Sequence, residues 1–118
     1  MEMIDHAYTL TTEYINQMPK AQRKQYGQFF TSKETAAFMA GLFAIPEDRS
    51  SLSVLDPGAG SGILSIALLE RLESVKTIDR VEFVCYENDP NIIELLRSNM
   101  DLACRQSTKS VSYKIVTD

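Results

Sequence analysis

The sequence predicts an α/β fold, a parallel sheet with flanking helices that is preceded by N-terminal helices. Two observations predict it. The first is the alternation of short apolar runs with runs of helical periodicity, in the order strand 52–56, helix 61–73, strand 81–87, helix 91–104 and strand 111–116. The second is a glycine-rich turn that joins the first strand to its helix. Strands and helices in this order form a parallel sheet with right-handed crossovers, so we expect an incomplete Rossmann-like arrangement.

The N-terminal part is predicted to be helical. Apolar residues recur at helical spacing over 3–18, so we expect an amphipathic helix that ends before Pro19. A polar, basic stretch follows. The next helix is expected to begin near Thr31, because this threonine and the glutamate three residues later match a capping box. We therefore divide the chain into an N-terminal helical segment, 1–30, and a ligand-binding domain, 31–118.

The glycine turn indicates which ligand the predicted sheet binds. Its glycines, Gly58, Gly60 and Gly62, are spaced G-x-G-x-G, whereas the dinucleotide fingerprint is G-x-G-x-x-G. A phosphate loop ends in Gly-Lys-Ser/Thr, but Gly62 is followed by Ile-Leu-Ser. With an acid, Asp56, at its entrance and no cation inside, the turn suits a ligand without phosphates, such as S-adenosylmethionine (SAM). The alternative is that a tight turn needs these glycines for steric reasons alone.

The second predicted strand ends in acids. Glu87 lies about 25 residues after the turn, and a carboxylate at this place can accept hydrogen bonds from two ribose hydroxyls. The alternative is a solvated acid at the end of a strand. Asp89 is better explained as the cap of the following helix, because Pro90 is typical of a first helical turn. A contact of Asp89 near the adenine of the ligand is the secondary interpretation.

The composition limits the classes of function. The chain has 118 residues and a net charge of −4, so it has no global basic field of the kind that attracts nucleic acid. Its two cysteines, Cys85 and Cys104, do not have the spacing of a metal site, and we expect no metal. Free thiols without a signal peptide favour a cytoplasmic protein. No apolar run reaches membrane-spanning length, so no membrane partner is expected.

Three stretches resemble the N-terminal part of adenine-specific DNA methyltransferases, particularly those of restriction–modification systems. Residues 26–32 are similar to that family's Gly-x-x-x-Thr-Pro segment, although Ser32 stands where the family usually has proline. Residues 56–62 resemble its Asp-Pro-x-x-Gly-Ser-Gly motif, and 86–90 its acidic motif after the second strand. The first of these stretches distinguishes amino-group methylation of DNA from other methyl transfers, because the other two are shared by many methyltransferases.

The resemblance implies an incomplete Rossmann-like SAM-dependent methyltransferase fold and transfer of a methyl group from SAM to adenine in double-stranded DNA. The alternatives are a methyltransferase that acts on RNA, protein or a small molecule, and a non-catalytic SAM- or nucleotide-binding module. By the resemblance, Thr31 contacts the methionine carboxylate and Asp118 the adenine amino group. The complete set of expected SAM-binding residues is Tyr26, Thr31, Asp56, Gly58, Gly60, Glu87, Asp89 and Asp118.

The family's catalytic Asn/Asp-Pro-Pro-Tyr/Phe tetrapeptide is absent from the sequence, in which every proline stands alone. We therefore assign no catalytic residue and expect a piece of a longer enzyme that positions SAM but is inactive by itself. In such a piece the first strand, 52–56, lacks a neighbour on one side. Because an unpaired apolar strand edge promotes association, we also expect self-association, as a dimer across this edge.

Overall fold

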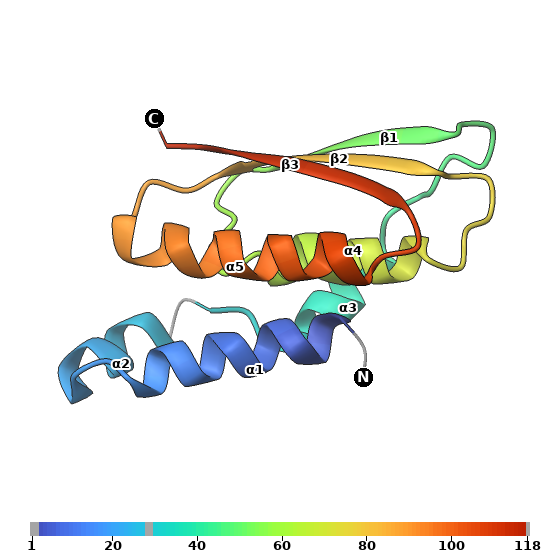
Figure 1. The fold of residues 1–118 in the computed structure, drawn as a ribbon. Coiled ribbons are helices and arrows are strands. Elements are labelled where there is room, and N and C mark those ends of the chain that lie inside the picture. Colours follow the sequence, from blue (N-terminus) through green and yellow to red (C-terminus); the bar gives the residue numbers. More distant parts are fainter. Residues whose placement is uncertain (1–2, 28–29, 118) are drawn as a thin grey trace.

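The structure is a computed structural model that describes residues 3–27 and 30–117, with residues 25–27 described by their backbone alone. The helices and strands follow the predicted order (Figure 1). Their bounds are α1 (Met3–Asn16), α2 (Lys20–Gly27), α3 (Lys33–Gly41), β1 (Ser51–Asp56), α4 (Ile63–Leu72), β2 (Arg80–Tyr86), α5 (Pro90–Gln106) and β3 (Ser110–Val116). Each strand begins one residue before its predicted start.

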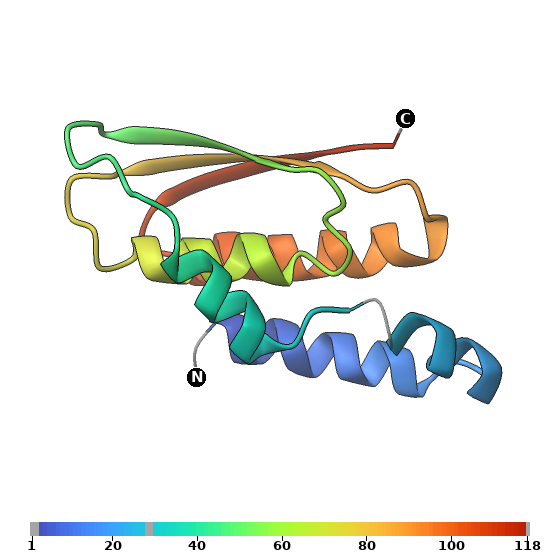
Figure 2. The same cartoon turned by 180° about the vertical axis from the view of Figure 1, so that it is seen from behind.

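The described strands form one sheet in the order β1-β2-β3, and both neighbouring pairs are parallel. Helices α4 and α5 lie side by side against one face of this sheet, and α1 and α3 pack beneath them (Figures 1 and 2). The molecule therefore has three layers: the sheet, the α4–α5 pair, and the N-terminal helices. This arrangement confirms the predicted α/β fold, a partial Rossmann-like sheet with flanking helices.

The core lies between the sheet and the α4–α5 pair. Alternate residues of β2, Val81, Phe83 and Cys85, point toward the helices and are fully buried, as the period of two in a strand requires. The helices pack apolar residues that recur with a period near 3.6 against these strand side chains. The core face predicted for the last helix is confirmed, since its four members are buried: Ile92, Leu96, Met100 and Ala103.

The start of α3 differs from the prediction. Thr31 was expected to cap this helix, but the cap is Ser32, whose hydroxyl accepts a hydrogen bond from the backbone N–H of Thr35 at 3.2 Å. Either hydroxyl can cap a helix, so local sequence does not distinguish them. The structure does, because the Ser32 backbone is extended, with φ −68° and ψ 156°, and the helix begins at Lys33. The capping-box prediction is therefore wrong by one residue.

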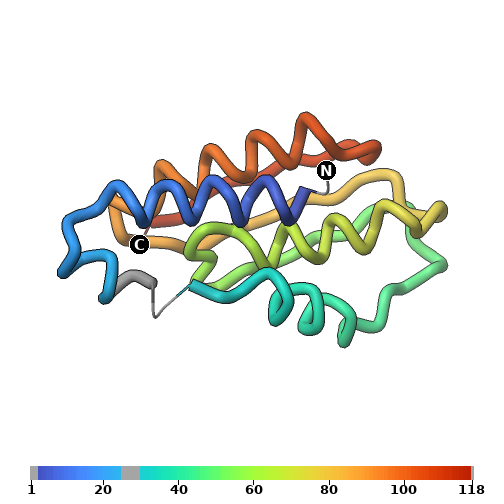
Figure 3. The backbone as a smooth tube through the Cα atoms, turned by 90° about the horizontal axis from the view of Figure 1, so that it is seen from below, coloured from blue at the N-terminus to red at the C-terminus, as the bar shows by residue number. Residues whose placement is uncertain are grey.

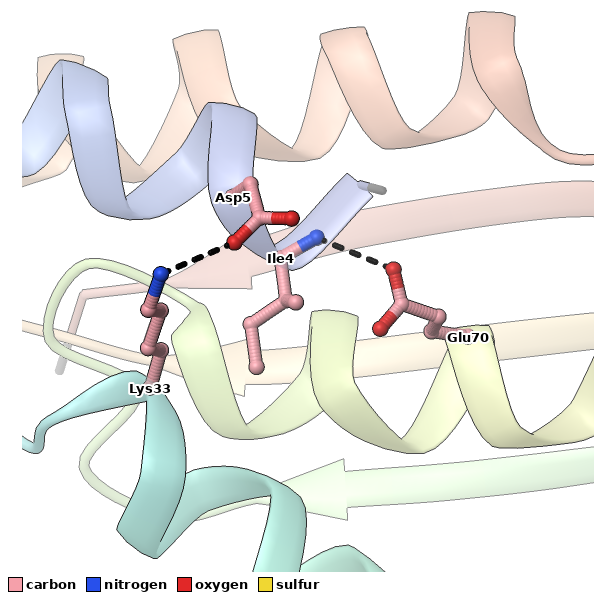
Figure 4. Close-up of polar contacts among 4 residues, drawn as sticks. All are labelled: Ile4, Asp5, Lys33 and Glu70. Atoms are coloured by element: carbon pink, nitrogen blue, oxygen red, sulfur yellow. Dashed lines mark hydrogen bonds and ion pairs between the residues drawn. The ribbon is translucent and has the colours of Figure 1, made fainter. Parts of the chain in front are cut away.

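Polar contacts fix the start of α1 to two other helices (Figure 4). The Ile4 backbone N–H lies in the first turn of α1, where it has no acceptor within the helix. It donates instead to the Glu70 carboxylate of α4 at 3.2 Å. The Asp5 carboxylate pairs with the Lys33 ammonium of α3 at 3.1 Å. Together with the buried Ile4 side chain, these contacts make α1 part of the folded unit.

Glu73, just after α4, joins this helix to the loop between α5 and β3. Its carboxylate accepts hydrogen bonds from the Ser107 hydroxyl at 2.5 Å and from the Thr108 N–H and hydroxyl at 2.8 Å. Burial raises the pKa of the Glu73 carboxyl, but these bonds and the charge of Lys109 lower it more, so the pKa lies below its usual range. The ionised carboxylate therefore stabilises the fold.

We expect Glu73→Gln to lower the free energy of unfolding at pH 7 by about 1 kcal/mol, because the amide accepts fewer hydrogen bonds and carries no charge. The folded-state pKa is depressed, so the difference should be complete above pH 4.5 and shrink as the pH falls through the folded-state value. Urea denaturation at pH 3 to 7 measures it. Glu47→Gln, at an exposed loop position, is the control. A difference that is constant over this range would contradict the prediction.

Candidate cofactor site

The glycine turn connects β1 to α4, and its backbone requires glycine. Gly58, Gly60 and Gly62 have φ angles of +137°, +55° and +84°, which other residues adopt at a cost. Gly62 also packs closely, because a Cβ atom at this position would lie 2.9 Å from Leu96 Cδ1. A Cβ at Gly58 would meet nothing within 4 Å. The steric explanation therefore accounts fully for Gly62, whereas the open space at Gly58 leaves room for a ligand.

Glu87 fixes the turn to the tip of β2. Its Oε1 accepts a hydrogen bond from the Gly60 N–H at 2.9 Å, and its Oε2 accepts one from the Asp89 N–H at 3.1 Å. The Ala59 N–H adds a bond to the Tyr86 carbonyl at 2.9 Å. The solvated-acid interpretation of Glu87 is therefore incomplete, because the carboxylate organises the turn between β1 and α4.

Asp89 and Pro90 begin α5 as the sequence predicts. Asp89 is the N-cap, its carboxylate accepts a hydrogen bond from the Asn91 N–H at 2.9 Å, and Pro90 occupies the first helical turn. The capping prediction is confirmed. Since the carboxylate has this structural role, its predicted contact near the adenine of a ligand stays a prediction.

Asp56, the last residue of β1, is an acid buried beside the turn. Only 7% of its surface is exposed, and its carboxylate accepts a hydrogen bond from the Ser65 hydroxyl of α4 at 2.7 Å. Burial raises the pKa of the Asp56 carboxyl, the Glu87 charge raises it further, and the Ser65 bond partly offsets both. An ionised carboxylate in this place costs free energy in the absence of a positive partner.

Two hollows meet at Gly58 and form a cleft over the carboxyl ends of β1 and β2. The larger, about 220 Å³, is lined by Pro57, Gly58, Tyr86, Glu87 and Asn88. The smaller, about 80 Å³, is lined by Phe30, Thr31, Asp56, Gly58, Ala59, Gly60, Ser61, Ile63 and Leu64. Ligands of open parallel sheets bind at this edge.

The cleft brings five of the predicted residues together. They are Thr31, Asp56, Gly58, Gly60 and Glu87. Asp89 lines neither hollow and lies two residues beyond Glu87. The side chain of Tyr26 and the whole of Asp118 lie outside the described residues, so their predicted contacts stay predictions.

Asn99 of α5 also contacts the turn, and the sequence analysis missed it. Its side chain is 1% exposed, and its Nδ2 donates to the Ser61 carbonyl at 2.8 Å and to the Thr11 hydroxyl at 3.4 Å. The Thr11 hydroxyl donates in turn to the Ala7 carbonyl at 2.7 Å. Asn99 Oδ1 is buried without a partner among the described residues. The available signal was a polar residue on the apolar face of a helix, directly before Met100.

Comparison with known proteins identifies the family. A family model described as N-6 DNA methylase matches residues 3–113. The chain belongs to this family. It is 47% identical over 53 residues to the Type II methyltransferase M.BsuBI of Bacillus subtilis, a match that covers 44% of this chain and 10% of that protein.

The name of a second relative describes a methyltransferase that acts on RNA. The chain is 34% identical over 92 residues to the tRNA1(Val) (adenine(37)-N6)-methyltransferase of Cronobacter sakazakii. This match covers 70% of the chain and 36% of that protein. The chain thus spans a small part of one relative and 36% of the other. Both relatives are methyltransferases, so the family uses a methyl donor.

Metal binding, thiol chemistry and membrane insertion also depend on the described residues. These contain no group of three or more His, Cys, Asp and Glu side chains that could hold a metal ion. Burial and the charge of Asp56 raise the pKa of the Cys85 thiol to about 11, so this thiol is protonated at neutral pH. No helix in residues 3–27 or 30–117 is long and apolar enough to cross a membrane.

Proposed function

We propose that the chain is the SAM-binding part of an enzyme that methylates the exocyclic N6 amino group of adenine in double-stranded DNA. The observation that carries this proposal is the pair of acids, Asp56 and Glu87, on the two sides of the glycine turn. Family membership gives the reaction class. The pair of acids supports the cofactor.

The chemistry of the cleft suits SAM. The described residues that line the two hollows include two acids and neither lysine nor arginine. Phosphates would be repelled here, whereas the ammonium and sulfonium groups of SAM would be attracted. The raised pKa of Asp56 reflects a charge without sufficient compensation, and a bound ammonium group would supply it. The residues therefore fit the cofactor that the resemblance implies.

Each side of the cleft suits one end of SAM. Glu87 would accept hydrogen bonds from the ribose hydroxyls. Each carboxylate oxygen has two acceptor directions, so Glu87 can do so while it still accepts from Gly60 and Asp89. Thr31 and Asp56 would hold the methionine end, with Gly58 and Gly60 allowing close approach. Tyr26, Asp89 and Asp118 complete the proposed set.

In the proposed mechanism this chain positions one reactant. SAM supplies an electrophilic methyl group on its sulfonium. The acids and the turn fix the two ends of the cofactor, and correct alignment contributes a large part of the acceleration of a transfer between two reactants. The sequence contains no Asn/Asp-Pro-Pro element to hold the adenine amino group, so we expect no turnover from these residues alone. Labelled adenine in duplex DNA after incubation with methyl-labelled SAM would contradict this.

Two nucleic-acid substrates have support. The family description and the name of the Bacillus subtilis relative favour DNA. The name of the Cronobacter sakazakii relative favours tRNA, which is the alternative function. Methyl transfer by the whole enzyme to duplex DNA but not to tRNA would decide for the first.

Asp56→Asn tests the cofactor site. We expect about tenfold weaker SAM binding, because the neutral amide loses a charge-assisted hydrogen bond to the ammonium group. The free energy of unfolding at pH 7 should not fall, since the variant removes a buried charge. The wild-type folded-state pKa is raised, so its stability should decrease as the pH rises from 3.8 through that value, and the variant should not show this decrease.

Calorimetric titration with SAM and urea denaturation measure the two effects of Asp56→Asn. Asp48→Asn, at an exposed loop position, is the matched control and should change neither. Equal SAM affinity in the wild type and Asp56→Asn would show that Asp56 does not contact the cofactor. Absence of SAM binding by the wild type would contradict the proposed site as a whole.

We also propose the domain division predicted from the sequence, which consists of an N-terminal helical segment, 1–30, and a SAM-binding domain, 31–118.

We further propose the self-association predicted from the sequence, a dimer across the β1 edge. Within the described sheet β1 pairs with β2 alone, and Leu55 is 62% exposed beside an apolar hollow that Phe43 and Pro46 also line. Light scattering that shows only monomer at micromolar concentration would contradict the dimer.

A further inference from the structure

Helix α2 adds charge but little packing to the fold. Its cations Lys20, Arg23 and Lys24 are exposed, and every described side chain of this helix is exposed. No acidic residue lies between Glu13 and Glu34, although the chain as a whole carries a net charge of −4. The helix is therefore a local basic surface on an acidic molecule. Burial of its side chains does not explain why it is placed there.

Contacts of α1 fix the position of α2. The Tyr14 hydroxyl, near the end of α1, donates a hydrogen bond to the Asn91 carbonyl at the start of α5. Since α5 begins directly after the carboxyl end of β2, the end of α1 lies at the edge of the sheet where the cofactor cleft opens. Helix α2 follows across Pro19 and extends at this end of the molecule (Figures 1 and 3).

The chain after α2 leads to the cleft. Phe30 and Thr31, a few residues beyond this helix, line the smaller hollow beside Asp56. The basic surface and the wall of the cofactor site are thus parts of one short stretch of chain. A macromolecule that contacts α2 would lie near the place from which the methyl group is transferred.

We propose that α2 binds the phosphate backbone of the DNA that carries the target adenine. This inference rests on the proposed function, because it assigns a contact surface to the same reaction. Exposed lysine and arginine side chains on a helix reach phosphate oxygens without reading sequence, and such contacts set the position of a protein on the duplex. Since the remainder of the chain carries a net negative charge, this surface concentrates the attraction near the cleft and orients the duplex toward it.

The salt dependence of DNA binding tests the proposal. Each phosphate contact contributes about 0.9 to the slope of log affinity against log salt concentration. We expect the K20Q/R23Q/K24Q variant to lose about 2–3 units of the wild-type slope, measured by fluorescence anisotropy with a labelled duplex. The matched control is R49Q/K76Q/R80Q. It removes the same charge from exposed positions in the loops before β1 and β2 and at the start of β2, at the amino end of the sheet.

The control should retain the wild-type slope. An equal loss of slope in both variants would overturn the proposal, because it would show an effect of net charge alone. Absence of salt-dependent DNA binding by the wild type at low salt would also overturn it, and so would tighter binding of a folded RNA through the same three cations. SAM titration separates this result from the proposed function. Both variants should bind SAM with wild-type affinity. Absence of SAM binding by the wild type would contradict only the proposed cofactor site.

Discussion

Gly62→Ala is expected to lower the free energy of unfolding by about 2–5 kcal/mol. Two costs add. The residue at this position has a φ of +84°, a left-handed conformation that disfavours any side chain. The new Cβ would also lie 2.9 Å from Leu96 Cδ1 and 3.4 Å from Met100 Sδ, inside a core where both neighbours are buried.

A series of glycine variants separates the two costs. Gly58→Ala has the backbone cost without the collision, since a Cβ there meets nothing within 4 Å. Gly41→Ala has neither, because it lies at the end of α3 in open space without a positive φ. Urea denaturation should therefore rank the losses in the order Gly62, Gly58, Gly41, with Gly41→Ala close to the wild type. Equal losses for Gly62→Ala and Gly58→Ala would show that the collision is relieved by movement of Leu96.

Glu87→Ala should weaken SAM binding by about tenfold to a hundredfold. The variant removes the proposed ribose acceptor, and it also frees the Gly60 and Asp89 N–H groups that organise the turn. Glu87→Gln keeps one acceptor oxygen, so its SAM affinity should lie between those of Glu87→Ala and the wild type. Calorimetric titration measures both.

The control for Glu87 is Glu82→Gln, an exposed acid on β2 that lies away from the carboxyl end of the strand. It should bind SAM as the wild type does. If both Glu87 variants bind SAM with wild-type affinity, the ribose site has been placed wrongly. A weaker affinity together with a lower free energy of unfolding would show that Glu87 serves the turn and the ligand at once.

The elements around the cleft could be predicted because local signals define them. A strand that ends in a glycine turn, and an Asp-Pro pair before a helix, have few other interpretations, and parallel pairing then brings the ends of β1 and β2 together. The cleft residues Asp56 and Glu87 follow from that topology. Their partners do not, because the bond from Ser65 to Asp56 depends on how α4 packs on the sheet.

Choices made by tertiary packing were not predictable. Thr31 and Ser32 are equally good caps of α3 by residue type, and only the extended backbone of Ser32 in the structure distinguishes them. Asn99 resembles any polar interruption of an apolar helix face until the carbonyl of Ser61 is placed beside it. No helix bounds were predicted for the polar, basic stretch before Thr31, which forms a helix of its own, α2.

Thr11, Asn99 and Ser61 connect α1, α5 and the glycine turn through one chain of hydrogen bonds. No residue of α1 is among those that line the cleft, yet we expect a ligand that restrains the turn to restrain the attachment of this helix as well. Thermodynamic linkage makes the effect reciprocal, so a change that loosens α1 should weaken the binding of the ligand by the same coupling free energy. Slower amide hydrogen exchange along α1 on ligand binding would report this coupling at a distance from the contact itself.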